Sequence, residues 1–246
     1  MHPILFHIGP LTVYSYGVMM AAAVIVCSFF LSRDARRAGL NSDLIVDIVF
    51  WVVISGLLGA RIFFVLLNLE FFAGNPIEIF MIQNGGLSWQ GGLILAAVVG
   101  MSLIRERSLP LWKTLDIFAP YIALGQSIGR IGCFFNGCCY GRPISWGIFF
   151  PVHQARLHPT QLYDALGLLV IFLILKRQKA FSSPKAQGEV FCLYLVLASF
   201  QRFVIEFFRA DHTQTIGGLS IFQIISLCIL IPAAYVTTRI KSRSRE

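Results

Sequence analysis

The feature that most constrains this chain is a series of apolar runs, each about as long as a bilayer is thick. A helix needs about 20 mostly apolar residues to cross the hydrocarbon core of a membrane. Only 13% of the residues are charged, whereas soluble domains carry about 25%. The sequence therefore predicts an all-α polytopic membrane protein with seven transmembrane helices. These are expected near residues 13–32, 45–67, 87–104, 115–135, 160–176, 189–208 and 220–238.

Lysine and arginine are divided unequally between the joints that connect these runs. The joints after the first, third, fifth and seventh runs hold 14 basic residues, whereas the opposite side holds only Arg142, Arg156 and Arg209. Basic residues favour the cytoplasmic side of a membrane, which predicts a periplasmic N-terminus and a cytoplasmic C-terminus. Residues 1–246 are expected to form a single integral membrane domain with a periplasmic loop region at about 136–159. The net charge of +8 comes from the basic residues of these joints, which is the pattern of membrane topology. We therefore expect no nucleic-acid partner.

Three arginines, Arg61, Arg130 and Arg202, lie within the apolar runs. An arginine at the centre of a membrane helix costs about 2.5–3.5 kcal/mol on insertion scales, so a functional role is expected. The planar guanidinium matches phosphate, and the obvious anion in a membrane is a lipid phosphate. The alternative is that these arginines reach the interface or pair with carboxylates. The carboxylates available for such pairing are Asp116, Asp164 and Glu206.

The neighbours of two of these arginines favour a buried site. Gly129 and Gly132 flank Arg130, and glycine permits close backbone approach and unusual dihedral angles. Glu206 follows Arg202 by four residues, so the two share a helix face and are expected to pair. A structural ion pair and a phosphate site are compatible, because a carboxylate also orients the arginine beside it.

Three other side chains have two interpretations each. Gln90 lies between two pairs of glycines. Either its amide hydrogen-bonds a lipid headgroup or a peptide, or the glycines are there to allow a tight contact between helices. Tyr16 is an interface aromatic or a site residue. His158 is an acid or base, or it anchors the loop before the fifth run. The histidines lack metal-ligand spacing.

Cys133, Cys138 and Cys139 follow Arg130 closely. Their spacing is unusual for zinc, and no nearby pair of cysteines or histidines completes four ligands, so no metal site is predicted. A structural role, thiol redox or nucleophilic chemistry, and metal binding all stay open as alternatives for this cluster.

Together these segments resemble the prolipoprotein diacylglyceryl transferase family over almost the whole chain. The resemblance implies an enzyme of the bacterial inner membrane that uses no cofactor. Its substrates would be phosphatidylglycerol and the lipobox cysteine of preprolipoprotein signal peptides, and the products a thioether-linked diacylglyceryl cysteine and glycerol phosphate. This is the first step of lipoprotein maturation. The motifs that carry the resemblance are Tyr14-Ser15-Tyr16-Gly17, Gly59-Ala60-Arg61, Gly85-Gly86-Leu87-Ser88, Gly129-Arg130-Ile131-Gly132, His158-Pro159-Thr160-Gln161 and Arg202-Phe203-Val204-Ile205-Glu206.

The same resemblance implies roles for individual residues. Arg130 would bind the lipid headgroup, and Arg202 would hold the phosphate and stabilise the leaving group. Tyr16 and Glu206 would complete the catalytic set. Both substrates would enter from the surrounding membrane lipids. The remaining substrate-binding positions would be Arg61, Gln90, Asn136, Gly141 and His158.

The chain departs from the family pattern at three positions. Cys133 and Cys138 stand where asparagine and glutamate are usual, and Gln90 stands where many members have a histidine proposed as base. No residue is therefore assigned to deprotonate the incoming thiol. The alternatives are Glu206, His158 and the positive charge of the arginines acting directly on the substrate thiol. The competing functions are a binding-only membrane protein of the same family, an anion transporter and a thiol-redox protein.

Overall fold

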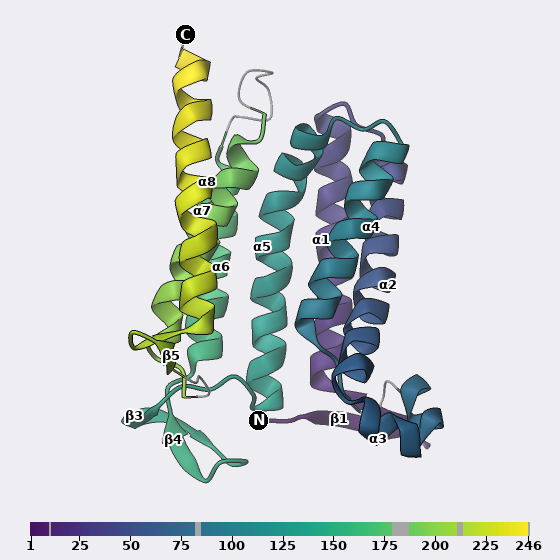
Figure 1. The fold of residues 1–246 in the computed structure, drawn as a ribbon, viewed down its shortest axis with the longest axis vertical. Coiled ribbons are helices and arrows are strands. Elements are labelled where there is room, and N and C mark those ends of the chain that lie inside the picture. Colours follow the sequence, from purple (N-terminus) through teal and green to yellow (C-terminus); the bar gives the residue numbers. More distant parts are fainter. Residues whose placement is uncertain (10, 82–84, 179–186, 211–213, 246) are drawn as a thin grey trace. The chain divides into compact units, whose positions relative to one another are not determined.

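The computed structural model describes residues 1–9, 11–81, 85–178, 187–210 and 214–245, and these are mostly helical (Figure 1). A helix of 17 to 26 residues occupies each of the seven predicted stretches, which confirms their helical character. The seven helices are α1 (Ser15–Arg37), α2 (Ser42–Leu67), α4 (Trp89–Glu106), α5 (Leu111–Asn136), α6 (Thr160–Lys176), α7 (Glu189–Glu206) and α8 (Ile221–Arg245).

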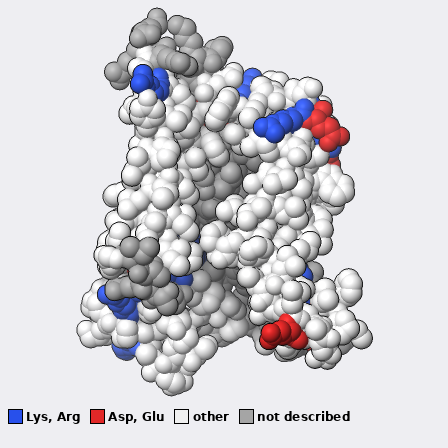
Figure 2. Space-filling model, viewed as in Figure 1, with Lys and Arg blue, Asp and Glu red and all other residues white. Residues whose placement is uncertain are grey.

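Three spans among the described helices are long and apolar enough to cross a membrane: Ser15–Arg37, Ser42–Leu67 and Ile221–Ser242. Many large apolar side chains on these helices are exposed, including Phe50 and Leu66 of α2. Within each part of the chain, the charged side chains seen in Figure 2 gather toward helix ends and leave an uncharged band between them. An apolar surface of this kind suits lipid, because water would penalise such extensive exposure.

Short elements connect the helices. Three antiparallel hairpins are formed by β1 (Ile4–Ile8) with β2 (Leu11–Tyr14), β3 (Pro143–Phe150) with β4 (Ala155–Leu157), and β5 (Gln214–Ile216) with β6 (Leu219–Ser220). The second hairpin lies in the loop region predicted at about 136–159. A short helix α3 (Leu69–Gly74) and a 3-10 helix η1 (Pro76–Phe80) follow α2.

The chain divides into two compact units, and the first comprises Met1–Leu31 and Leu115–Glu246. In this unit α7 packs along both α6 and α8. A buried cluster of small and branched side chains joins α5, α6 and α7, and this packing holds the three helices together. The cluster consists of Ala119, Ala123, Ile171, Leu175, Val190 and Tyr194.

The second unit, Ser32–Thr114, is built on a close contact between α2 and α4. A Cβ atom at Gly59 would lie 2.5 Å from the carbonyl oxygen of Gly91, and one at Gly91 would lie 2.4 Å from the carbonyl oxygen of Gly59. Only glycine permits this approach, and small residues at helix contacts are typical of membrane proteins. The helix-packing interpretation of the glycines beside Gln90 is thus confirmed.

Arg61 of α2 is buried in the second unit, where its five N–H groups all donate to backbone carbonyls. Gly85 and Gly86, which supply two of the acceptors, have φ angles of 84° and 79°, a conformation that favours glycine. The guanidinium therefore organises the segment before α4, and its predicted contact with substrate stays a prediction. The acceptors are the carbonyls of Glu78, Ile79 (3.0 Å), Met81 (3.3 Å), Gly85 (2.5 Å) and Gly86 (2.9 Å).

Candidate active site

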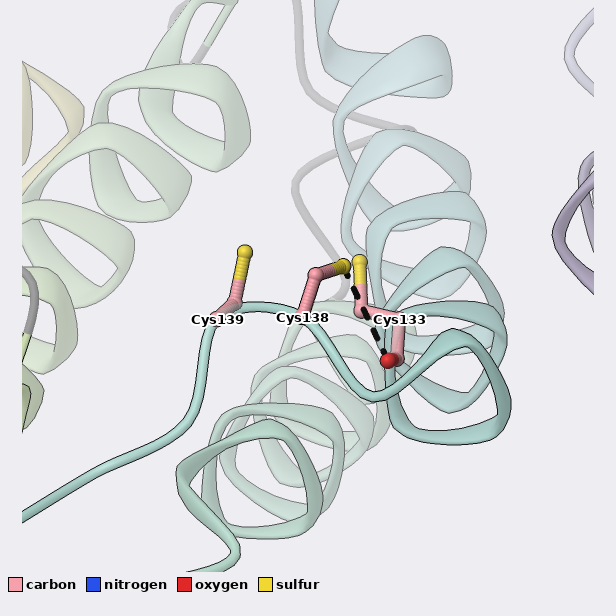
Figure 3. A group of neighbouring side chains, drawn as sticks. All are labelled: Cys133, Cys138 and Cys139. Carbon is pink, nitrogen blue, oxygen red and sulfur yellow. Dashed lines mark hydrogen bonds between the residues drawn. The ribbon is translucent and has the colours of Figure 1, made fainter. Parts of the chain in front are cut away.

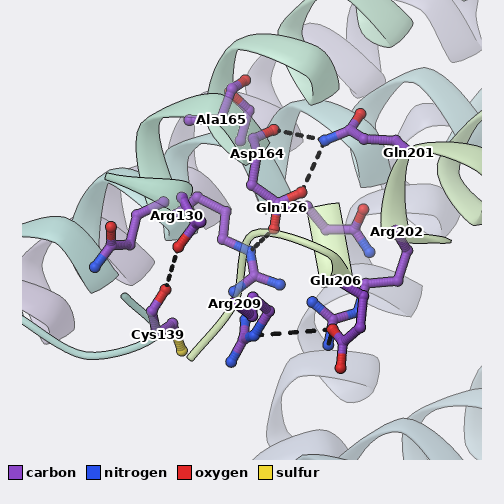
Figure 4. Close-up of polar contacts among 12 residues, drawn as sticks. Gln126, Arg130, Cys139, Asp164, Ala165, Gln201, Arg202, Glu206 and Arg209 are labelled. Carbon is purple, nitrogen blue, oxygen red and sulfur yellow. Dashed lines mark hydrogen bonds and ion pairs between the residues drawn. The ribbon is translucent and has the colours of Figure 1, made fainter. Parts of the chain in front are cut away.

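Three arginines come together in the first unit, beside the end of α7 (Figure 4). Arg130 lies near the C-terminal end of α5, Arg202 lies in α7, and Arg209 follows α7 directly. They meet because α5, α6 and α7 pack against one another. The first two were singled out from the sequence, whereas Arg209 was counted only among the basic residues of the outer joints.

Arg130 is held by a carboxylate on the neighbouring helix. Its Nε lies 2.8 Å from Oδ2 of Asp164, whose side chain is only 6% exposed. Gln201 of α7 donates to the other carboxylate oxygen of Asp164 and to its carbonyl, each at 2.8 Å. One buried carboxylate thus connects α5, α6 and α7. For Arg130, the alternative of pairing with a carboxylate is confirmed, and Asp164 is the residue that provides it.

Asp116, which was also named as a possible partner of an arginine, pairs with backbone N–H groups instead. Its carboxylate accepts hydrogen bonds from the backbone N–H groups of Gly188 (2.6 Å) and Phe191 (2.9 Å). These groups begin α7, and the first N–H groups of a helix lack partners within the helix. Asp116 therefore caps α7 and lies outside the arginine cluster.

Glu206 lies at the centre of the second ion pair. Its side chain is 1% exposed, and its Oε2 lies 2.8 Å from Nη2 of Arg202 and 3.9 Å from Nε of Arg209. Ser220 donates to the other carboxylate oxygen at 2.9 Å, and the ring of Phe222 lies 4.8 Å from Cζ of Arg202. The pairing predicted from the four-residue spacing is confirmed.

Several guanidinium donors remain unused in this cluster. Among the described residues Arg130 is bonded only through Nε, and Nη1 of Arg202 is buried without a hydrogen-bond partner. An unmatched buried donor costs about 1–3 kcal/mol, so such a group points to a missing acceptor. Three guanidinium groups gather around the carboxylates of Asp164 and Glu206. With unused donors on Arg130 and Arg202, the cluster is suited to bind an anion.

Gly141 lies where three chain segments cross. Its N–H donates to the carbonyl of His158 at 2.9 Å, and it forms a backbone bridge with Arg209. A Cβ atom at this position would lie 2.5 Å from the carbonyl oxygen of Phe208 and 2.6 Å from Cβ of His158. Glycine is required here, because the loop after α5 must reach the segment that carries Arg209.

Replacing Gly141 with alanine is expected to lower the free energy of unfolding by about 1–3 kcal/mol, the usual cost of overpacking. The added methyl group collides with backbone, which moves less easily than a side chain. The matched control is Gly74→Ala, since a Cβ atom there meets nothing within 4 Å. Unfolding in detergent should separate the two variants, and equal stability of both would contradict this account of Gly141.

The other predicted site residues are distributed over both units. Tyr16 packs against Gly132, at which a Cβ atom would lie 3.2 Å from the tyrosine ring, and Asn136 ends α5. His158 lies 3.3 Å from the hydroxyl of Tyr163. In the second unit, the Gln90 amide oxygen accepts a hydrogen bond from Ser88 at 2.7 Å. Their proposed contacts with substrate stay predictions.

The environment of His158 is mainly aromatic. Its ring centroid lies 5.1 Å from that of Trp146, 5.6 Å from that of Phe208 and 6.0 Å from that of Tyr163. Edge-to-face packing of this kind contributes to the stability of the loop beyond buried area alone. The contacts favour the loop-anchoring interpretation over a role as acid or base.

The sulfur atoms of Cys133, Cys138 and Cys139 all lie within 4.8 Å of one another (Figure 3). Hydrogen bonds with Cys133 and Cys138 lower the pKa of the Cys139 thiol, and the charges of Arg209 and Arg130 act in the same direction. The cysteine cluster is thus next to the arginine cluster. Sequence spacing placed the three residues in one segment, but it did not predict that their sulfur atoms would converge.

Gln201 and Ser220 were not singled out from the sequence, although each hydrogen-bonds a carboxylate of the cluster. Gln201 had one available signal, since an amide side chain next to Arg202 in an apolar helix is itself unusual. Ser220 had none, because serine is common at the start of a helix.

The comparisons with known proteins agree with one another. The family model for prolipoprotein diacylglyceryl transferase matches residues 3–239. Proteins named phosphatidylglycerol–prolipoprotein diacylglyceryl transferase include one from Staphylococcus xylosus that is 32% identical over 98% of this chain and 91% of that protein. The one from Staphylococcus carnosus is 34% identical over 96% and 90%, and the one from Synechococcus elongatus is 34% identical over 92% and 82%.

Proposed function

This chain belongs to the prolipoprotein diacylglyceryl transferase family, and we propose that it transfers the diacylglyceryl group of phosphatidylglycerol to a lipobox cysteine of preprolipoproteins. The cysteine sulfur forms a bond to the terminal carbon of the diacylglyceryl group, and the bond between that carbon and the phosphate oxygen breaks. Its electron pair leaves with glycerol phosphate, and the thiol proton passes to the phosphate or to water.

One observation supports this function more than any other: among the described residues, guanidinium donors of Arg130 and Arg202 have no acceptor. The phosphodiester of phosphatidylglycerol carries a single negative charge. Guanidinium groups bind phosphate oxygens in a planar fork, and their bonds to ionised groups are about twice as strong as neutral ones. As the ester bond breaks, charge grows on the phosphate, and preorganised donors stabilise that change.

Within this site, Arg130 binds the headgroup and Arg202 stabilises the departing phosphate. Glu206 orients Arg202 through the ion pair of 2.8 Å, and Tyr16 lines the same region beside Gly132. Asn136, Gly141 and His158 complete the proposed substrate-binding set of this unit, in which Gly141 shapes the loop and His158 anchors it. Gln90 and Arg61 of the second unit are also proposed to contribute to substrate binding, Arg61 by holding the segment before α4.

The proposed topology has all seven helices crossing the inner membrane of a bacterium as one integral membrane domain. The basic joints lie in the cytoplasm, so the N-terminus and residues 136–159 are periplasmic. Both substrates are membrane-embedded, because one carries acyl chains and the other an apolar signal helix. They therefore enter sideways from the surrounding membrane lipids, between helices.

The experiment that tests the function is a transfer assay with purified protein and phosphatidylglycerol labelled in its acyl chains. The acceptors are a lipobox peptide with cysteine and the same peptide with serine in its place. Label should move to the cysteine peptide alone. Binding of lipid and peptide by folded protein without any transfer would instead establish the binding-only member of the family.

Replacing Arg202 with alanine is expected to lower kcat by about 10²-fold, the effect of removing one donor from a developing charge. Binding of the peptide should be preserved, since the lost donor faces the phosphate. Arg239→Ala is the matched control, because Arg239 also lies over an aromatic ring, at 5.2 Å from that of Tyr235. An Arg202→Ala variant with the kcat of the wild type would exclude the proposed role.

A further inference from the structure

Cys133, Cys138 and Cys139 form a cluster that the reaction as described does not use. Cys133 lies in the last turn of α5, and the other two lie in the loop that follows. Figure 3 shows all three side chains on the same side of that loop, and their sulfur atoms lie within 4.8 Å of one another. Zinc–sulfur bonds of about 2.3 Å place tetrahedral sulfur ligands about 3.8 Å apart, so small side-chain movements would form a metal site.

Side chains at the start of α6 hold the loop that carries Cys138 and Cys139. The carbonyl of Cys138 accepts a hydrogen bond from the side chain of Gln161 at 2.5 Å, and that of Cys139 accepts one from Thr160 at 2.7 Å. Cys139 has a φ of 60°, a conformation that few side chains adopt. These bonds compensate for the unfavourable conformation, and they hold the loop where the three sulfur atoms lie within 4.8 Å of one another.

Three protein ligands are the number found in catalytic zinc sites. Structural zinc sites have four protein ligands, whereas catalytic sites have three and leave the fourth position to water or substrate. The sequence offered no fourth ligand near the three cysteines, which argued against a structural site but agrees with an open one. A Zn²⁺ ion with three thiolates has a net charge of −1, and Arg130 and Arg209 lie beside Cys139 (Figure 4).

The proposed reaction also requires a group that makes the acceptor thiol nucleophilic. A free cysteine thiol is mostly protonated at neutral pH, since its ordinary pKa is about 8.5. In the described part of the site, the carboxylates of Asp164 and Glu206 are both held by arginines. Coordination to a metal ion deprotonates a thiol outright, which removes the need for a side-chain base.

Resting on the proposed function, we infer that Cys133, Cys138 and Cys139 bind a zinc ion whose open fourth position takes the acceptor cysteine as a thiolate. On binding, the thiol loses its proton to water. Its sulfur then forms the bond to the diacylglyceryl carbon, the carbon–oxygen bond breaks, and the electron pair leaves with glycerol phosphate. The thioether product is neutral and binds zinc more weakly than a thiolate, so it is released.

Metal content is the first test. Protein purified in detergent without chelators should contain about one zinc per chain, measured by elemental analysis. The variants Cys133→Ser, Cys138→Ser and Cys139→Ser should each lose it. Cys228→Ser is the matched control, because that cysteine is exposed on α8 and lies outside the cluster. Wild-type protein without zinc that shows a Cys133–Cys138 disulfide by mass spectrometry would overturn the inference.

The open position is tested with cobalt in place of zinc. The absorption bands between thiolate and cobalt should grow when the cysteine peptide is added and should not change with the serine peptide. An unchanged spectrum with the cysteine peptide would overturn the assignment of the fourth position. This readout needs no turnover, so it stays valid in variants that have lost activity.

Activity separates this inference from the proposed function. Transfer should fall by at least about 10²-fold when zinc is removed, the usual contribution of proton transfer, and it should return when zinc is added. Full transfer by metal-free protein would overturn the inference and leave the proposed function intact. A zinc protein that binds the peptide thiol but never transfers lipid would support the metal site and contradict the proposed function.

Discussion

Replacing Arg130 with alanine is expected to reduce transfer by at least about 10³-fold, because a guanidinium supplies two donors to the phosphate and one donor is worth about 10²–10³ in kcat. The change has a second consequence. The carboxylate of Asp164, which is 6% exposed, loses its cation, and breaking a buried ion pair costs about 3–5 kcal/mol. The transfer assay with labelled phosphatidylglycerol, together with unfolding in detergent, measures both effects.

Two further substitutions separate the loss of phosphate binding from the loss of stability. Asp164→Asn removes the ion pair and leaves the guanidinium in place, so stability should fall more than activity. Arg107→Ala is the matched control, since Arg107 forms an ion pair with Asp47 in the other unit. Nearly normal transfer by stable Arg130→Ala protein would contradict the proposed phosphate site.

Replacing Glu206 with alanine is expected to lower the free energy of unfolding by about 3–5 kcal/mol, the cost of breaking a buried ion pair. Its carboxylate is 1% exposed and lies between Arg202 and Arg209, so its removal takes this carboxylate away from two cations. The hydroxyl of Ser220 also loses its acceptor. Chemical unfolding in detergent measures the change, and transfer should fall as well because Arg202 is no longer oriented.

Glu189→Ala provides the comparison for this variant. Glu189 belongs to the same helix, and it lies 3.9 Å from Lys241, whose side chain is 53% exposed. The Glu189 side chain is 13% exposed, but its partner is in contact with water and the two are 3.9 Å apart. A pair that solvent screens in this way contributes about 0–1 kcal/mol. If both glutamate variants lost the same free energy of unfolding, burial of the Glu206 carboxylate would not explain the loss. The role of Glu206 as the buried partner of Arg202 and Arg209 would then be wrong.

The two arginines Arg61 and Arg130 illustrate the limit of reasoning from sequence. Each lies beside glycines in an apolar run, and each was predicted to contact a lipid phosphate. The structure distinguishes them: all five donors of Arg61 are used by backbone carbonyls, whereas Arg130 is bonded only through Nε among the described residues. Nothing local encodes this difference, since it depends on segments 17 to 34 positions away along the chain.

The cysteines show a related limit. Their spacing argued against zinc only on the assumption that four protein ligands are needed. The convergence of the three sulfur atoms depends on a loop held by Thr160 and Gln161, which lie about 20 residues further along the chain. A pattern of residue types in one segment could not predict that arrangement.

The sequence by itself determined the properties that depend on near neighbours. Apolar runs of bilayer length predicted seven helices, and the four-residue spacing of Arg202 and Glu206 predicted their ion pair, because a helix places such positions on one face. Only the tertiary structure decided which carboxylate holds Arg130, which guanidinium donors remain unused and where the three sulfur atoms meet. Those contacts join separate helices and loops, and they form only when the packing of α5, α6 and α7 brings distant segments within bonding distance.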